Sequence, residues 1–148
     1  MVSRGVYCLC IAVDKDIDVE VGALGLMAFP RGLYVYIGSA LNGFEPRILR
    51  HVDASYGAHK ISHWHIDFLL RMPEVYIESV YLRVTDERVE CTLAREVSSR
   101  GEPVRSFGCS DCRCKSHLFR VREFGFLPEL GLESWPFHNR AIQGGYIK

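Results

Sequence analysis

The chain has 148 residues, of which 18 are Lys or Arg and 18 are Asp or Glu, so its formal net charge is zero with neutral histidines. This excludes an overall basic surface, and nucleic-acid binding would need a local patch. The length corresponds to one domain over residues 1–148, and 48% hydrophobic residues are typical of a compact core. The apolar run from Val6 to Val13 is too short to span a bilayer and leads into an Asp-Lys-Asp sequence instead of a signal cleavage site. We therefore expect a cytoplasmic domain without a membrane partner.

Hydrophobic patterning predicts three strands and one hairpin. Residues 5–13 are apolar at odd and even positions, which is typical of a central strand covered on both faces. Residues 18–21 alternate polar and apolar side chains, and a second apolar stretch with turn-forming glycines continues to residue 30, so residues 18–30 predict an additional N-terminal hairpin. Residues 33–38 predict a strand whose two tyrosines share one face, and residues 75–84 predict a buried strand.

Helices are predicted between these strands. Residues 44–52 carry an apolar side chain every four positions, which indicates an amphipathic helix. Arg47, Arg50 and His51 would lie together on this helix, away from its apolar stripe. A second helix is predicted over residues 62–71, with its N-cap at residue 62.

A third helix is predicted to begin at an N-cap formed by Thr85 or Asp86 and to end before Gly101. Beyond Pro103 we expect loops with a short strand or helix, among them a cysteine-rich loop at residues 105–119 and a C-terminal extension. The order of elements predicts an α/β fold of the α+β type. Its sheet would be small, mixed and mostly antiparallel, with helices flanking it.

Two strand tyrosines, a helix arginine and a later carboxylate form a set of groups that suits phosphodiester hydrolysis. Arginine can bind two phosphate oxygens, a carboxylate can hold Mg²⁺ beside them, and a tyrosine oxygen can orient or deprotonate water. Taken singly, such tyrosines are more often core residues. The candidates are Tyr7, Tyr36, Arg47 and Glu90.

The order of Gly5-Val6-Tyr7, Tyr36-Ile37-Gly38, Arg47 and Glu90 resembles the GIY-YIG nuclease superfamily over roughly residues 5–103. The resemblance implies that Tyr7 helps to activate the nucleophile and that Tyr36 and Arg47 contact the scissile phosphate. It also implies that Glu90 binds one divalent ion, Mg²⁺ or Mn²⁺, with Glu96 as the alternative ligand. The partner would be DNA.

Longer motifs are similar to the Uri-type branch of this superfamily, which is sometimes fused to an endonuclease III type glycosylase. They are Tyr34–Ala40, His63–Asp67, Glu90-Cys91 and Phe107–Phe119. The resemblance therefore implies a role in DNA repair and a functional link to such a glycosylase.

The chain departs from the family pattern in three ways. The two tyrosine motifs are unusually far apart because of the predicted hairpin, the asparagine expected after the third helix is missing, and Ser39 replaces a frequent lysine. Without that cation, the proton acceptor is expected to be a histidine, His51 or His63, because histidine titrates near neutrality. On a strand, His63, His65 and Asp67 would share one face and could bind a metal, whereas on the predicted second helix His63 and Asp67 are neighbours and His65 points elsewhere.

The six cysteines divide into two groups. Cys8, Cys10 and Cys91 are interpreted as small apolar core residues. A Cys-x2-Cys-x-Cys-x2-His sequence supplies four soft ligands that suffice for tetrahedral Zn²⁺, although zinc sites usually use two separated pairs. Reactive thiols or an oxidised pair are the alternative. The four residues are Cys109, Cys112, Cys114 and His117.

Basic residues also gather between positions 105 and 122, where five face one acid. With Arg47 and Arg50 on the first helix, Arg113 and Lys115 are candidates for nucleic-acid contacts. The leading hypothesis is a metal-dependent DNA endonuclease. The alternatives are a non-catalytic nucleic-acid-binding module, and a zinc or redox protein that works through residues 109–117. The sequence leaves the DNA substrate and the oligomeric state open.

Overall fold

The computed structural model describes residues 3–56, 64–109 and 113–135. Within them, one six-stranded sheet has the order β6-β7-β4-β1-β5-β8, and all of its pairings are antiparallel. This sheet and its flanking helices confirm the predicted α+β class. The strands are β1 (Gly5–Val13), β4 (Gly32–Ala40), β5 (Val75–Val84), β6 (Gly101–Pro103), β7 (Leu118–Val121) and β8 (Glu133–Ser134).

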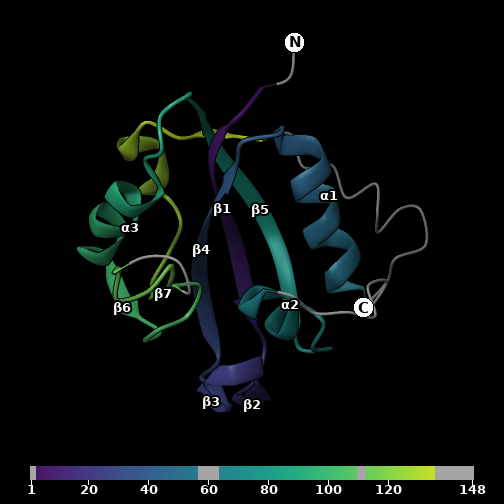
Figure 1. Cartoon of the computed structure of the whole chain (residues 1–148). Coiled ribbons are helices and arrows are strands. Elements are labelled where there is room, and N and C mark those ends of the chain that lie inside the picture. Colours follow the sequence, from purple (N-terminus) through teal and green to yellow (C-terminus); the bar gives the residue numbers. More distant parts are fainter. Residues whose placement is uncertain (1–2, 57–63, 110–112, 136–148) are drawn as a thin grey trace.

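The helices cover both faces of this sheet. Helices α1 (Phe44–Ser55) and α2 (His65–Leu70) lie on one side, and α3 (Glu90–Ser98) lies on the other (Figure 1). Two short 3₁₀ turns, η1 (Gly22–Leu24) and η2 (Leu127–Leu130), complete the described elements. None of the helices in the described segments has the length and apolar character that a membrane span requires.

Strand β1 is the centre of the fold, as its sequence predicts. All nine of its residues are buried between β4 and β5. Tyr7, Leu9 and Ile11 pack on the side of α1 and α2, whereas Cys8 and Cys10 pack on the side of α3. The burial of each large apolar side chain contributes roughly 1.5 to 3 kcal/mol, which explains why this strand is apolar on both faces.

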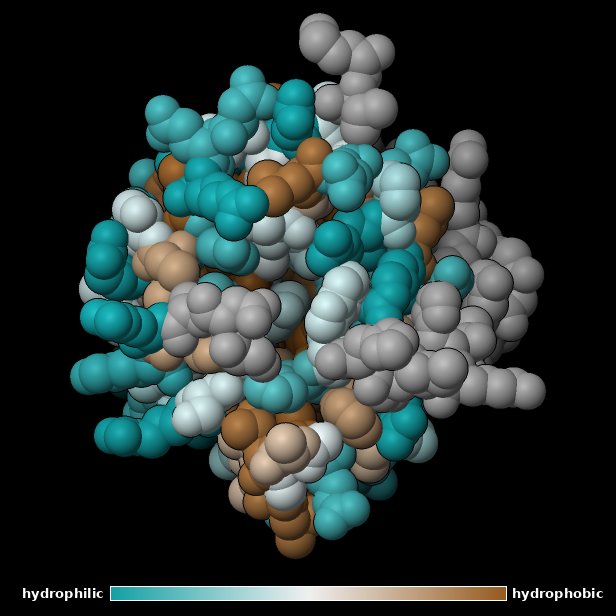
Figure 2. All heavy atoms as spheres, in the orientation of Figure 1, coloured by the Kyte–Doolittle hydropathy of each residue, from teal (hydrophilic) through white to brown (hydrophobic). Residues whose placement is uncertain are grey.

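The predicted hairpin is present as β2 (Ile17–Glu20) and β3 (Leu26–Phe29), which form a separate two-stranded sheet. It extends from one end of the main sheet (Figure 1). Its inner side chains Val19 and Phe29 join the core on the α1 side, but Leu26 is 68% exposed. The surface is correspondingly hydrophobic at that end (Figure 2).

The second helix begins later than its sequence pattern predicts. Trp64 has an extended backbone, with φ −108° and ψ 150°, so α2 starts at His65. The Asp67 carboxylate accepts the Trp64 backbone N–H at 3.2 Å and thereby satisfies one of the free donors at the helix start. The predicted cap Ser62 lies outside the described residues.

The third helix also starts later than predicted. Its N-cap is Val89, and neither Thr85 nor Asp86 serves as the cap. The Thr85 hydroxyl accepts the backbone N–H of Glu87 at 3.0 Å, and this local turn competes with helix formation. As a result, Glu90 is the first residue of α3 and not a residue of its second turn.

The pairing of β1 with β4 places Tyr7 directly opposite Gly38. The Tyr7 ring lies across this glycine, since a Cβ atom at position 38 would be 2.5 Å from Tyr7 Cζ and 3.0 Å from Cε1. Gly38 does not have a positive φ. It is therefore required by side-chain packing and not by backbone conformation.

We expect Gly38→Ala to lower the free energy of unfolding by about 1 to 3 kcal/mol, because Tyr7 must move to admit the methyl group. Urea denaturation would measure the change. Ser39→Ala, on the next residue of the same strand, is the matched control and should change stability by no more than about 0.5 kcal/mol. Equal stability of Gly38→Ala and the wild type would contradict the packing argument.

Candidate functional site

A cleft of about 430 Å³ lies beside the end of β4 that β7 leaves uncovered. Strand β7 pairs with β4 only from Leu33 to Tyr36, and one more hydrogen bond follows, from Ile37 N to His117 O at 2.9 Å. Within the described segments, no strand pairs with the remainder of this edge of β4, which we call its open edge. Because no strand covers this edge, side chains from both faces of the sheet can reach the same space.

This cleft brings together the four residues that the sequence proposes for catalysis. Tyr7 comes from β1, Tyr36 from β4, Arg47 from the first turns of α1 and Glu90 from the start of α3. Helices α1 and α3 lie on opposite sides of the sheet, so only the open edge of β4 allows Arg47 and Glu90 to line one cleft. Glu96, the alternative carboxylate, does not line it.

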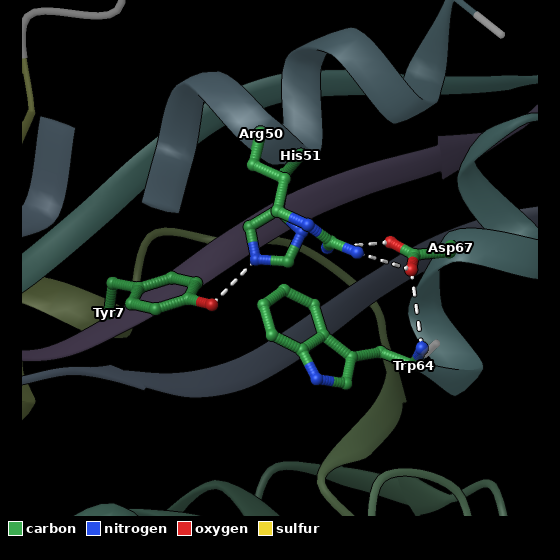
Figure 3. Close-up of polar contacts among 5 residues, drawn as sticks. All are labelled: Tyr7, Arg50, His51, Trp64 and Asp67. Atoms are coloured by element: carbon green, nitrogen blue, oxygen red, sulfur yellow. Dashed lines mark hydrogen bonds and ion pairs between the residues drawn. The ribbon is translucent and has the colours of Figure 1, made fainter. Parts of the chain in front are cut away.

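A hydrogen bond of 2.6 Å joins Tyr7 Oη and His51 Nε2 (Figure 3). Burial raises the pKa of Tyr7 well above its ordinary value, Tyr36 adds to this effect, and the nearby Arg47 guanidinium opposes it. The pKa of His51 is lowered to about 3, chiefly by burial, while Asp67 acts against this shift. Near neutral pH the tyrosine is therefore protonated and the imidazole is uncharged.

The prediction that His51 lies away from the apolar stripe of its helix is wrong. His51 is fully buried and does not line the cleft. It follows Ile48 by three residues, so it shares the packed side of α1 with that side chain. Its Nδ1 atom has no hydrogen-bond partner among the described residues. Among the described residues, the hydrogen bond that links His51 to the cleft is therefore the one to Tyr7.

Both arginines of α1 contact Trp64, but only one of them is paired with a carboxylate of the described residues. The guanidinium carbons of Arg47 and Arg50 lie 4.6 and 3.8 Å from the centre of its ring. Arg50 also donates two hydrogen bonds to Asp67, at 3.2 and 3.1 Å, so its guanidinium is bound within the protein (Figure 3). Arg47 lines the cleft and has no ion-pair partner in the described part of the chain. Of the two arginines, it is therefore Arg47 that is placed for an anion in the cleft.

Burial also determines the protonation state of the Tyr36 hydroxyl. Its pKa is raised strongly by burial, and the negative charges of Glu90 and Asp67 add to the rise. The Tyr36 ring makes edge contacts with His51 and Phe107, with centroids 6.0 and 6.3 Å apart. Tyr36 is therefore a fixed, protonated hydrogen-bond donor at the cleft.

The cleft contains further residues that the sequence analysis does not assign. His65 lines it, although a helix from residue 62 predicts that this side chain points elsewhere. Its Nδ1 accepts the Gly108 N–H at 2.9 Å, and Gly108 has a φ of +74°. Trp64, His65 and Gly108 lie within motifs of the Uri-type resemblance, whereas Arg88 has no sequence signal. His63 lies outside the described residues.

Three metal-ligating side chains lie together at the border of the cleft. Cys91, Cys114 and His117 place one ligand atom each within 4.8 Å of one another, and Cys91 Sγ is 3.9 Å from His117 Nε2. Cys109 is not in this group, since its thiol donates to Phe107 O at 3.4 Å. Cys112 lies outside the described residues. The group could hold a metal ion.

This arrangement corrects two interpretations of the cysteines. Cys91 is half-buried beside His117, so it is not a simple core residue. It takes the place expected for Cys109 in the ligand set. Spacing along the chain could not reveal this, because Cys91 and His117 are 26 positions apart.

The two basic residues predicted for the loop lie elsewhere. Arg113 and Lys115 line a second hollow of about 450 Å³ beside α3, and neither lines the cleft. Cys91 and Cys114 also line this second hollow, whereas His117 lines the cleft. The three metal-ligating side chains thus lie between the two hollows.

Glu90 is the one carboxylate among the described residues that line the cleft. Mg²⁺ prefers oxygen ligands, keeps several waters and is often bound by one or two carboxylates together with substrate phosphates. The donor set of the cleft is compatible with such an ion when a phosphate is present.

Residues 6–129 match a protein family described as Domain of unknown function DUF123. The chain belongs to this family. The matched range extends from β1 to η2 and includes the cleft and the Cys91, Cys114 and His117 group. Comparison with curated proteins and with solved structures gave no match. The function must therefore be argued from the geometry of the cleft.

The buried His51 predicts a pH dependence of stability. Its pKa is 6.5 as a free side chain and about 3 in the fold, so the unfolded chain binds more protons between these values. As pH falls from 6.5 toward 3, this group lowers the free energy of unfolding by up to about 1.4 kcal/mol per pH unit. His51→Gln keeps a hydrogen-bonding group for Tyr7 but cannot titrate, so its stability should depend less on pH.

Urea denaturation between about pH 4 and 7 would compare the slopes. His65→Gln is the matched control, because His65 is only half-buried and should affect the slope less. Identical slopes for the wild type and His51→Gln would show that His51 is not held neutral by its surroundings.

Proposed function

We propose that the protein is a divalent-metal-dependent DNA endonuclease of the GIY-YIG type, which hydrolyses phosphodiester bonds. The observation that carries this proposal is that Tyr7, Tyr36, Arg47 and Glu90 line one cleft although they come from four separate elements. These are the residues that the sequence motifs select. Their chemistry matches the needs of a phosphate that must be bound, neutralised and attacked by water.

Arg47 is proposed to bind the scissile phosphate. Its planar guanidinium rests against Trp64, which restricts its orientation, and no carboxylate of the described residues is paired with it. An oriented guanidinium that is not paired with a carboxylate can donate two parallel hydrogen bonds to phosphate oxygens. Arg88 supplies a second cation to the cleft, and Tyr36 can donate its hydroxyl proton to the same phosphate.

Glu90 is proposed to hold Mg²⁺ or Mn²⁺ together with the phosphate. When bound there, the ion would neutralise the charge that develops on the phosphate oxygens. A single protein carboxylate holds such an ion weakly without substrate. We therefore expect the metal and the DNA to bind cooperatively at Glu90.

Tyr7 and His51 are proposed to form the proton path. Tyr7 lines the cleft and its Oη is hydrogen-bonded to His51 Nε2, so in this proposal Oη accepts a proton from the attacking water while its own proton moves to His51. The positive charge of Arg47 is one cause of the low pKa of His51. A phosphate bound to Arg47 would offset this charge and make His51 a better proton acceptor.

The similarity to the Uri-type branch extends the proposal to DNA repair. An endonuclease that acts beside a glycosylase of the endonuclease III type would meet abasic or nicked duplexes. Such DNA is therefore the first substrate to examine, along with branched and single-stranded DNA.

We expect the wild type to cleave at least one of these DNAs with Mg²⁺ or Mn²⁺. Tyr7→Phe, Arg47→Ala and Glu90→Gln should each lower the cleavage rate by about 10²-fold or more, because each removes a group that contacts the reacting atoms. Gel-resolved single-turnover cleavage would measure the rates, and circular dichroism would show that each variant is folded.

Glu96→Gln is the matched control for Glu90→Gln, because Glu96 lies on the same helix but does not line the cleft. It should leave cleavage unchanged. Full activity of Glu90→Gln with loss of activity in Glu96→Gln would disprove the assignment of the metal ligand.

A non-catalytic DNA-binding module is the second candidate. The observation in its favour is that burial holds Tyr7 protonated and keeps the pKa of His51 at about 3, so neither group is a ready base in the free protein. In this case DNA binding should weaken as salt rises, and no divalent ion should yield products on any substrate. In a plot of the logarithm of the binding constant against the logarithm of salt concentration, Arg47→Ala would then lower the slope by about 1, the share of one phosphate contact.

A further inference from the structure

We propose that Cys91, Cys114 and His117 bind one Zn²⁺ ion, which joins the start of α3 to the segment that precedes β7. The proposal does not depend on nuclease activity. It concerns a different group of side chains from the four proposed for catalysis, and it can be tested without DNA.

The geometry of the three side chains is close to that of a zinc site. Their ligand atoms lie within 4.8 Å of one another, and the distance from Cys91 Sγ to His117 Nε2 is 3.9 Å. With Zn–S near 2.3 Å and Zn–N near 2.0 to 2.1 Å, tetrahedral coordination requires ligand atoms roughly 3.5 to 3.8 Å apart. Side-chain adjustments of about 1 Å would complete the site.

The donor atoms select the metal. Two sulfurs and one imidazole nitrogen form a soft set that suits Zn²⁺ and does not suit Mg²⁺ or Ca²⁺, which prefer oxygen. The two thiols are half-buried and line a hollow beside α3, so an ion could reach them from solvent. Among the described residues these three are the ligands, and a tetrahedral ion takes one more.

Two of the ligands lie on backbone that is already fixed. Cys91 is the second residue of α3. His117 is held by two backbone hydrogen bonds, from its N–H to Phe107 O and from Ile37 N to its carbonyl, each at 2.9 Å. The folded chain therefore brings these ligands together before any ion binds, which lowers the entropy cost of forming the site.

The position of the site links it to the cleft. Cys91 directly follows Glu90, and His117 itself lines the cleft. An ion at this point would fix the first turn of α3 and with it the backbone of Glu90.

The two thiols are also close enough that a Cys91–Cys114 disulfide is the competing outcome. Two thiols would lose two electrons to an oxidant to form this bond, whereas zinc binding releases thiol protons and changes no oxidation state. Metal content and thiol state together distinguish the two.

The test measures metal content in the full chain, expressed with zinc in the medium and purified under reducing conditions without chelators. Mass spectrometry of the metal should find one zinc per wild-type chain, and Cys91→Ser and Cys114→Ser should each lose most of it. Cys109→Ser is the matched control, because Cys109 is half-buried nearby but lies outside the group, and it should retain the zinc.

A second measurement keeps the proposal testable if the serine variants do not fold. Co²⁺ added to the reduced, metal-free wild type should give the strong visible bands of a tetrahedral site and a thiolate charge-transfer band. The melting temperature should also rise on metal binding.

Three results would overturn the proposal. The first is wild-type protein without zinc that shows no thiolate band with Co²⁺. The second is a Cys91–Cys114 disulfide that persists under the reducing conditions of the purification. The third is zinc that is lost in Cys109→Ser but kept in Cys91→Ser. Loss of DNA cleavage alone bears on the proposed nuclease and not on this site.

Discussion

The contact of the Tyr7 ring with Gly38 constrains the whole cleft, because it fixes where the tyrosine hydroxyl can lie. With no side chain at position 38, the ring crosses β4 and its hydroxyl reaches His51 Nε2 at 2.6 Å. This bond ties the central strand to α1. Arg47 lies one helical turn before His51, so the same contact also sets the position of the cation that faces the cleft.

The open edge of β4 is the second constraint. Strand β7 ends its pairing at Tyr36, and the space beyond is shared by α1 on one side of the sheet and the start of α3 on the other. A cation, a carboxylate and buried tyrosines can therefore meet at one point. A chain with zero net charge thus has two cations, Arg47 and Arg88, at one cleft, which is the local charge that the proposed phosphate site requires.

The start of α3 is where the two proposed metals would meet. Glu90 presents oxygen to the cleft, and the next residue, Cys91, presents sulfur to Cys114 and His117. Hard and soft donors on adjacent residues would separate the two ions by their chemistry. If both proposals hold, the late start of α3 at Glu90 would serve both sites, because Glu90 and Cys91 are the first two residues of the helix.

The sequence by itself determined the three long strands, the extra hairpin and the α+β class, because hydrophobic periodicity is a local property, and its motifs selected Tyr7, Tyr36, Arg47 and Glu90, which all line the cleft. It did not determine the start of α3, where a Thr85 side-chain turn outweighs helix propensity. Nor did it place His51 in the core or Cys91 beside His117. Only the tertiary structure decided the last two points, because the Tyr7–His51 and Cys91–His117 contacts join residues 44 and 26 positions apart in the chain.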